Sequence, residues 1–342
     1  MLFLINAPPI RFNNFLWKIC KLAYLLKDIW QKEFSGWLIT DCAVRSKTVI
    51  YICLRKDVPE EQASRMFDHD IHTEMFVLSL AEPQGTRSGV RTLTGYNKPR
   101  LGIALLPQPQ GLLAARNRDG QVSVMGGGST FPDEFIHPDN SPMPWRIKCI
   151  NGYAYSVGGQ RKIYKRVDIG KWERFADLPR SEHIERVGFN DMDAFSESDM
   201  YAVGGHGDVW HYDGKIWTQM GFPSNVQLGT VTCAGDGNVY ISGEGGSLWI
   251  GKKSTWKRVY QGGSSILWND VLWFEGKLWL ASDYKLRVWD GKEMQSVKHK
   301  GEEVSAYGHM DARDGLLIVA SPYAVWGFDG KEWKDIVAPY ID

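Results

Sequence analysis

The sequence predicts an all-β fold, a seven-bladed β-propeller of four-stranded antiparallel blades, with six blades as the alternative. Three observations predict it. A short apolar strand that ends on two small residues recurs along the chain, hairpin turns stand on both sides of it, and a bulky residue opens the last strand of each unit. Four short strands cannot bury both of their faces alone, so we expect such units to stack around an axis.

The recurring strand sets the period of the repeat. It ends at Gly127, Gly159, Gly205, Gly243, Ser282 and Ser321. The last four of these positions lie 38 or 39 residues apart. A fixed period of this size indicates an array of like supersecondary units.

Asp-Gly and Glu-Gly turns are expected to form the hairpins within each unit. The turns before the recurring strand are Asp236-Gly237, Glu275-Gly276 and Asp314-Gly315, and Asp-Gly-Lys runs follow the next strand at 213–215, 290–292 and 329–331. Asp-Gly between alternating strands is typical of a type I′ turn, in which both central residues need a positive φ. We therefore expect the glycines of these units to serve turns.

A large apolar residue opens the last strand of five units. These residues are Trp172, Trp217, Trp256, Met294 and Trp333. The Met at one position indicates that bulk is required there rather than an indole N–H. We expect Trp217, Trp256 and Trp333 to be buried between the blades.

The order of small pair, Tyr-Asp, Trp and Pro resembles the kelch repeat. The best matches are residues 201–223 and 155–179, and the resemblance extends over about residues 100–337. In the later units the small pair is Ser-Gly or Ala-Ser, and the units are shorter than a kelch repeat. The resemblance implies a kelch-like propeller.

Two helical elements are expected beside the strands. In the segment 1–35, apolar residues at helical spacing predict a helix over 13–34 that docks onto the propeller or a partner. Its Lys residues would suit a membrane surface, but its apolar positions spread too widely around the helix, so a membrane role is disfavoured. A second helix is expected over 58–70, with Asp57 as N-cap and Pro59 in its first turn.

The propeller itself is expected over 36–342. Four strand-like runs within 36–106 are assigned to the first blade, which contains the 58–70 insertion. The expected blades are 36–106, 107–145, 146–180, 184–222, 226–262, 266–300 and 304–337.

Composition excludes several classes of partner. Forty Lys and Arg residues balance forty Asp and Glu residues, so there is no basic field for a nucleic acid. No apolar run reaches the about 18 residues of a membrane span, and the first residues lack the features of a secretory signal. The five cysteines contain no CxxC pair, which favours reduced thiols in a cytoplasmic protein.

No catalytic, metal or cofactor site is predicted. The glycine-rich runs 204–208 and 243–246 lack the Gly-Lys-Ser/Thr continuation of a phosphate loop. His69 and His72 stand three residues apart, but no third ligand is evident. No Gly-x-Ser-x-Gly motif is found.

The loops that follow the small pairs differ in every unit and predict a protein-binding rim. The residues expected there are Arg161, His183, His206, Asp208, Glu244, Tyr284 and Tyr323. A constant scaffold with divergent charged and aromatic loops is typical of recognition surfaces. By analogy, we expect a non-enzymatic cytoplasmic inhibitor or immunity protein that binds and neutralises a toxin or effector. The alternative is a glycan-binding or glycan-processing propeller that uses the central channel.

Overall fold

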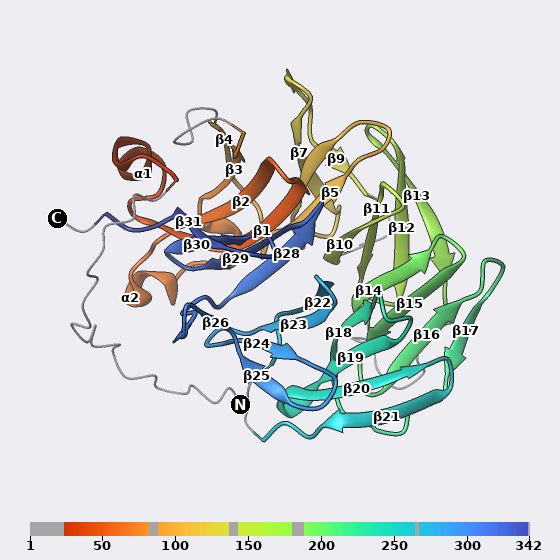
Figure 1. Cartoon of the computed structure of the whole chain (residues 1–342). Helices are drawn as coiled ribbons and strands as arrows, with labels where there is room; N and C mark the ends of the chain where they lie inside the picture. The colour runs from red at the N-terminus through yellow and green to blue at the C-terminus, as the bar shows by residue number, and fades with distance from the viewer. Residues whose placement is uncertain (1–23, 82–87, 137–142, 180–187, 264–266, 341–342) are drawn as a thin grey trace.

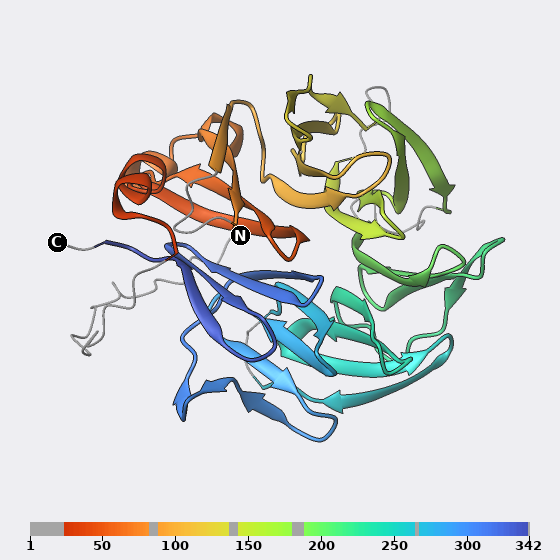
Figure 2. The same ribbon diagram turned by 45° about the horizontal axis from the view of Figure 1, so that its top comes forward.

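Seven antiparallel sheets surround a central channel in the computed structural model (Figures 1 and 2). The structure describes residues 24–81, 88–136, 143–179, 188–263 and 267–340. The first strand of every sheet contacts the first strands of both neighbouring sheets, and the first sheet meets the seventh. The predicted seven-bladed propeller is therefore confirmed.

The blades are numbered in chain order, and within each one the strands pair in sequence order, except that β9 of blade 2 pairs with β7. Blade 1 comprises β1 (Trp37–Ser46), β2 (Val49–Lys56), β3 (Thr73–Ser79) and β4 (Ser88–Leu93). Blade 2 comprises β5 (Arg100–Ala104), β6 (Gln110–Ala114), β7 (Gln121–Gly126), β8 (Ser129–Thr130) and β9 (Glu134–Phe135). Blade 3 comprises β10 (Pro144–Ile150), β11 (Tyr153–Gly158), β12 (Lys162–Asp168) and β13 (Lys171–Asp177).

Blades 4 and 5 comprise β14 (Phe189–Ser196), β15 (Asp199–Gly204), β16 (Asp208–Tyr212) and β17 (Trp217–Met220); β18 (Leu228–Cys233), β19 (Val239–Gly243), β20 (Ser247–Lys252) and β21 (Thr255–Tyr260). Blades 6 and 7 comprise β22 (Asp270–Phe274), β23 (Lys277–Ala281), β24 (Leu286–Trp289) and β25 (Met294–Ser296); β28 (His309–Arg313), β29 (Leu316–Ser321), β30 (Ala324–Phe328) and β31 (Trp333–Val337). A small hairpin, β26 (Lys298–His299) and β27 (Glu302–Glu303), lies between these last two blades.

This strand order gives the disc two different faces. Because neighbouring strands are antiparallel, the connections from second to third strand and from blade to blade emerge on one face, which we call the loop face. The connections from first to second and from third to fourth strand emerge on the other, the turn face. Every first strand begins at the loop face, so residues such as Arg100 and His309, which open β5 and β28, lie at that end of the channel.

The boundaries of blade 2 differ from the expected ranges. Its first strand, β5, lies within the range 36–106 that the repeat pattern assigned to blade 1. The strand that ends at the Gly126-Gly127 pair is β7, the third strand of its blade, whereas the corresponding strands elsewhere are second strands. Hydrophobic alternation identifies a strand but does not show whether it is the second or the third of its blade. The strand that ends at Gly126-Gly127 was therefore assigned as a second strand although it is a third.

Besides forming turns, the small pairs let the chain that enters the same blade approach closely. A Cβ on Gly204 would lie 2.0 Å from the carbonyl oxygen of Gly188, and one on Gly308 would lie 2.1 Å from that of Ala320. Gly204 does not have a positive φ, so its role is close backbone approach. This corrects the expectation that these glycines serve turns alone.

The predicted hairpins are confirmed, but they use two kinds of turn. Glu275 and Gly276 both have a positive φ, at 48° and 72°, as a type I′ turn requires. In the Asp-Gly-Lys turns only the glycine does. There the Asp213 carboxylate accepts hydrogen bonds from the backbone N–H groups of Lys215 and Ile216, each at 2.9 Å. The aspartate thus acts through its side chain, as in an Asx turn.

The bulky residues at the start of the fourth strands are less buried than expected. Trp172 is 8% exposed, but Trp217, Trp256 and Trp333 are only half-buried. Their packing still lies between blades, as expected. Trp333 contacts Phe328 of its own blade and Trp279 of blade 6, with ring centroids 4.9 and 6.1 Å apart. Trp256 contacts Phe222, which follows blade 4, with ring centroids 5.6 Å apart. The fourth strand is the outer edge of a blade, so the next blade does not cover it completely.

The chain closes the ring where its two ends meet. The backbone N–H groups of Tyr24 and Leu25 donate to the carbonyls of Asp335 and Ile336 in β31, at 2.9 and 3.0 Å. Because these two amides bond to β31, the helix begins only at α1 (Lys27–Glu33). The expected continuous helix over 13–34 is therefore wrong at 24–26, and its residues 13–23 lie outside the described residues.

The insertion between β2 and β3 is also less helical than expected. It contains one helical turn, α2 (Glu60–Ala63), with Pro59 rather than Asp57 at the N-cap position, and a 3-10 turn, η1 (Asp68–Asp70). Asp57 instead donates its backbone N–H to Gly36. Asp68 is fixed by Arg55 and by the backbone of Lys98, which shapes the segment as a strap on the loop face. No helix among the described residues is long and apolar enough to cross a bilayer.

Candidate functional site

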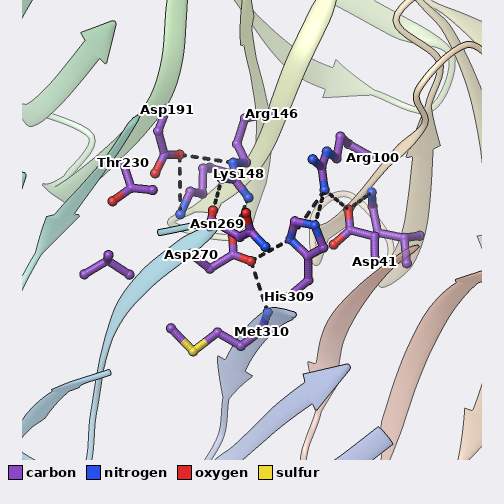
Figure 3. Close-up of polar contacts among 12 residues, drawn as sticks. Asp41, Arg100, Arg146, Lys148, Asp191, Thr230, Asn269, Asp270, His309 and Met310 are labelled. Atoms are coloured by element: carbon purple, nitrogen blue, oxygen red, sulfur yellow. Dashed lines mark hydrogen bonds and ion pairs between the residues drawn. The ribbon is translucent and has the colours of Figure 1, made fainter. Parts of the chain in front are cut away.

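Charged side chains from all parts of the ring meet in the central channel (Figure 3). Aspartates on the first strand of one blade accept backbone hydrogen bonds from the first strand of the next. Asp191 accepts from Val231 at 3.1 Å, and Asp270 accepts from Met310 at 3.1 Å. Asp41 accepts from Leu101 at 2.9 Å. These carboxylates fasten neighbouring blades, which is a structural role.

Arginine and lysine side chains neutralise these carboxylates. Arg146 lies 2.5 Å from Asp270 and 3.5 Å from Asp191, and Lys148 lies 3.6 Å from Asp191. Burial acts to raise the pKa of Asp270, but the Arg146 charge and the hydrogen bond from His309 outweigh it and hold that pKa well below its usual range. The channel therefore contains a compensated network of buried charges.

His309 connects this network to the loop face. Its Nδ1 lies 2.8 Å from Asp270 Oδ2, and its Nε2 lies 2.9 Å from Arg100 Nη1. Since a guanidinium only donates, Nε2 accepts and the ring proton is on Nδ1, facing Asp270. Figure 3 shows the resulting chain from Arg100 through His309 to Asp270.

A cavity of about 370 Å³ opens where this chain reaches the loop face, and we call it the mouth pocket. Blades 1, 2, 6 and 7 line it, and its charged and titratable side chains are Arg55, Asp68, Lys98, Arg100, Asp283, Tyr307 and His309. Arg55 is 7% exposed and binds Asp68 through Nη1 at 2.9 Å. Its buried Nε has no hydrogen-bond partner within the described part of the chain.

Three exposed aromatic residues stand directly beside the mouth pocket. Phe67, Tyr284 and Tyr323 are 72%, 74% and 49% exposed. Each is adjacent in sequence to a residue that lines the pocket, namely Asp68, Asp283 and Pro322. We call these three side chains the aromatic rim. Exposed aromatics around a polar centre are typical of protein-binding surfaces.

Four of the predicted partner-binding residues are exposed on the loop face. Tyr284 and Tyr323 belong to the aromatic rim, and the Tyr323 hydroxyl lies 3.5 Å from Asp57 in the insertion. His206 and Glu244 are exposed in the second-to-third connections of blades 4 and 5. His183 lies outside the described residues.

Arg161 and Asp208 are instead buried against each other. Arg161 Nε lies 2.6 Å from Asp208 Oδ2, and its guanidinium also donates to the carbonyl of Pro179. Asp208 accepts a further hydrogen bond from the Trp210 indole at 2.9 Å. This pair joins blades 3 and 4 under the loops, which corrects the expectation that both side chains face a partner.

Sequence reasoning did not find the mouth pocket. Its central residues, Arg100 and His309, are 209 positions apart and belong to no motif. The available signal was the presence of charged residues inside otherwise apolar first strands, such as Asp41 and Asp270. Phe67 was missed because the insertion was interpreted as a helix.

Cysteines and possible metal ligands are two further candidates for a reactive site in the described part of the chain. The cysteines of the described residues are free, and burial raises the pKa of Cys53 to about 12. Burial likewise raises the pKa of Cys42, Cys149 and Cys233. Among the residues that the structure describes, no group of three His, Cys, Asp or Glu side chains could hold a metal ion.

One relative and several solved structures are similar to this chain. No family model matches. Over 227 residues the chain is 32% identical to the immune protein Tsi7 of Pseudomonas aeruginosa, a match that covers 64% of this chain and 73% of that protein.

Among solved structures, YCF48 bound to a D1 peptide has a TM-score of 0.59 at 13% identity and covers 89% of this chain and 93% of its own. The WD40 β-propeller domain of Doa1 has a TM-score of 0.54 at 11% identity, covering 84% of this chain and 90% of its own. PorZ of Porphyromonas gingivalis has a TM-score of 0.58 at 8% identity, covering 89% and 38%. At these identities the likeness shows the fold alone.

Proposed function

Because the chain belongs to the family of the immune protein Tsi7 of Pseudomonas aeruginosa, we propose that it is an immunity protein that binds a toxin or effector protein and neutralises it. The observation that carries the proposal is the 32% identity over 227 residues. The aromatic rim and the mouth pocket support it, because they form an exposed polar and aromatic surface on a rigid ring.

Neutralisation is proposed to occur by covering a functional surface of the effector. A stable protein complex buries about 800 Å² on each partner, an area that one face of a propeller readily supplies. We propose that the loop face supplies it through the insertion and the second-to-third connections. His206, Glu244, Tyr284 and Tyr323 are the residues of the original prediction that we retain for this interface.

We further propose that the chain acts by binding and not by catalysis. A glycan-processing enzyme would need a protonated acid near the channel mouth. Asp270, the carboxylate bound to His309, has its pKa held well below its usual range and is bonded to Arg146. Asp41 accepts two backbone hydrogen bonds, from Cys42 and Leu101. These engagements favour a structural role for Asp41 and Asp270 over acid catalysis.

Two finer points belong to the same proposal. We propose a cytoplasmic location, where an immunity protein would meet an incoming effector. We also keep the kelch-like character of the repeats as a prediction, since it rests on residues 155–179 and 201–223.

The proposal is tested by capture and protection. The tagged chain is used to capture proteins from its native host, and each captured protein is expressed alone and together with the chain in a bacterium that has neither. We expect one captured protein to arrest growth alone and to be harmless when co-expressed. An unrelated seven-bladed propeller is the control. The proposal fails if no captured protein is toxic or if the chain does not restore growth.

The same complex separates binding from catalysis. After dissociation in denaturant and refolding, the effector should have an unchanged mass and should regain its toxicity. A covalently altered effector would contradict the non-enzymatic proposal.

A further inference from the structure

We propose that the mouth pocket binds an acidic side chain of the effector, an Asp or Glu whose carboxylate pairs with Lys98 and Arg100. This inference rests on the proposed function and names the group that the loop face recognises.

The pocket contains a buried hydrogen-bond donor that needs an acceptor. Arg55 is more than nine-tenths buried, lines the pocket, and its Nε has no partner among the described residues. A buried donor without an acceptor costs about 1–3 kcal/mol, so a ligand that supplies oxygen acceptors is favoured.

The pocket also contains two cationic side chains that are not fully paired with carboxylates. Lys98 is exposed, and no ion pair among the described residues includes its ammonium group. Arg100 is loosely paired, with Asp41 at 3.9 Å, and its side chain is 37% exposed. Its Nη1 is directed at His309, which leaves the rest of the guanidinium fork for a second acceptor. That planar fork matches the two oxygens of a carboxylate.

The anions of the pocket favour a singly charged ligand. Asp68 is neutralised by Arg55 at 2.9 Å. Asp283 is exposed at the rim, where it accepts a hydrogen bond from Asn269. Asp283 and Asp41, which lies behind Arg100, repel a doubly charged phosphate group more strongly than a singly charged carboxylate. The chain as a whole has no net charge that would attract a polyanion.

The surroundings suit a protein side chain rather than a free carboxylate. Phe67, Tyr284 and Tyr323 are exposed next to pocket-lining residues, so an effector surface bound to them would cover the pocket and exclude water from the ion pair. Exclusion of water strengthens such a pair, and aromatic residues around a central contact are typical of hot spots. The cavity of about 370 Å³ is large enough for one acidic side chain and part of its neighbour.

The first test uses the effector that the wild-type chain captures and neutralises. We expect Lys98→Glu to weaken its binding by about 30-fold or more, since like charges at an interface cost several kcal/mol. Lys98→Glu combined with Arg100→Gln should weaken it further. Lys215→Glu, a charge reversal at an exposed turn-face lysine, is the matched control and should retain wild-type affinity. Thermal unfolding of each variant shows that it is folded.

A charge swap identifies the partner group. One Asp or Glu of the effector, changed to Lys, should lose affinity for the wild-type chain and regain it with Lys98→Glu. The inference is overturned if the two pocket variants bind with wild-type affinity. Because the wild-type complex is measured in the same experiment, that result would leave the proposed function intact. The proposed function itself would fail only if the wild-type chain neutralised no effector.

A second test needs no effector. The α-amide of N-acetylglutamate, whose side-chain carboxylate is its only charge, should shift the backbone NMR signals of Lys98, Arg100 and Gly308 in a saturable manner. The α-amide of N-acetylglutamine, its uncharged isostere, should not. The shifts should disappear in the Lys98→Glu, Arg100→Gln variant. Equal shifts from both compounds, or shifts that persist in the variant, would overturn the inference.

Discussion

The channel and the mouth pocket both collect charged side chains from several blades, but they differ in how completely those charges are paired. In the channel, Asp270 bonds to Arg146, to His309 and to a backbone N–H group, so its charge is fully compensated. In the mouth pocket, Lys98 and part of Arg55 lack such partners among the described residues. The difference indicates that the channel charges stabilise the ring. It also supports the proposal that the incompletely paired charges of the pocket bind a ligand.

The largest effect is expected from breaking the channel network. Asp270→Ala removes the closest partner of Arg146 and leaves its largely buried guanidinium with only the more distant Asp191, which Lys148 shares. We expect it to lower the free energy of unfolding by about 3–5 kcal/mol. Urea denaturation at pH 7 measures this loss. Asp270→Ala with Arg146→Met should recover part of it, and a loss below about 1 kcal/mol would show that the channel charges are not structural.

A similar but smaller loss is expected at the buried pair under the loops. Arg161→Ala removes the contact to Asp208 and to the Pro179 carbonyl, and should cost about 3 kcal/mol of stability. Because this side chain is buried, the folded variant should bind the effector with unchanged affinity. Calorimetric titration below the unfolding temperature checks this. If a folded Arg161→Ala variant lost affinity for the effector, Arg161 would have to be counted among the partner-binding residues.

The aromatic rim should show the opposite behaviour. Tyr284→Ala should weaken effector binding by about 2 kcal/mol, roughly 30-fold, as is usual for a hot-spot tyrosine. Its stability should change by less than about 0.5 kcal/mol, because the side chain is 74% exposed. Ile216→Ala removes another exposed large side chain, at a turn-face connection, and serves as the control. If it weakens binding instead, the turn face is the interface.

The smallest effect is expected in the pH dependence of stability. The folded pKa of Asp270 lies below its unfolded value of about 3.9, so its contribution is complete above that value and falls as the pH drops below it. Urea denaturation should show about 1 kcal/mol less stability at pH 3 than at pH 5 from this group. Asp270→Asn cannot titrate, so the gap between wild type and variant should narrow in acid. A gap that stays constant would contradict the assigned pKa direction.

The fold was predictable because its determinants are local. The spacing from Gly205 to Ser321 and the Asp-Gly-Lys turns each act within one hairpin or one blade, and they indicated the propeller correctly. The loops that contain Tyr284 and Tyr323 follow from the same pattern, since a connection after a strand of known phase must emerge at a known face. Phase errors arose only where the pattern was interrupted, as at Gly127 in blade 2.

By itself, the sequence thus determined the repeat, the hairpins and the exposed tyrosines of the loop face. Only the tertiary structure decided that Arg161 turns inward to Asp208, and that Arg100 and His309 meet at 2.9 Å across 209 positions of sequence. The physical reason is that a blade is encoded within about 40 residues. The mouth pocket and the channel form only when seven blades close into a ring, because closure alone brings blade 7 beside blade 1 and within reach of Arg100 of blade 2.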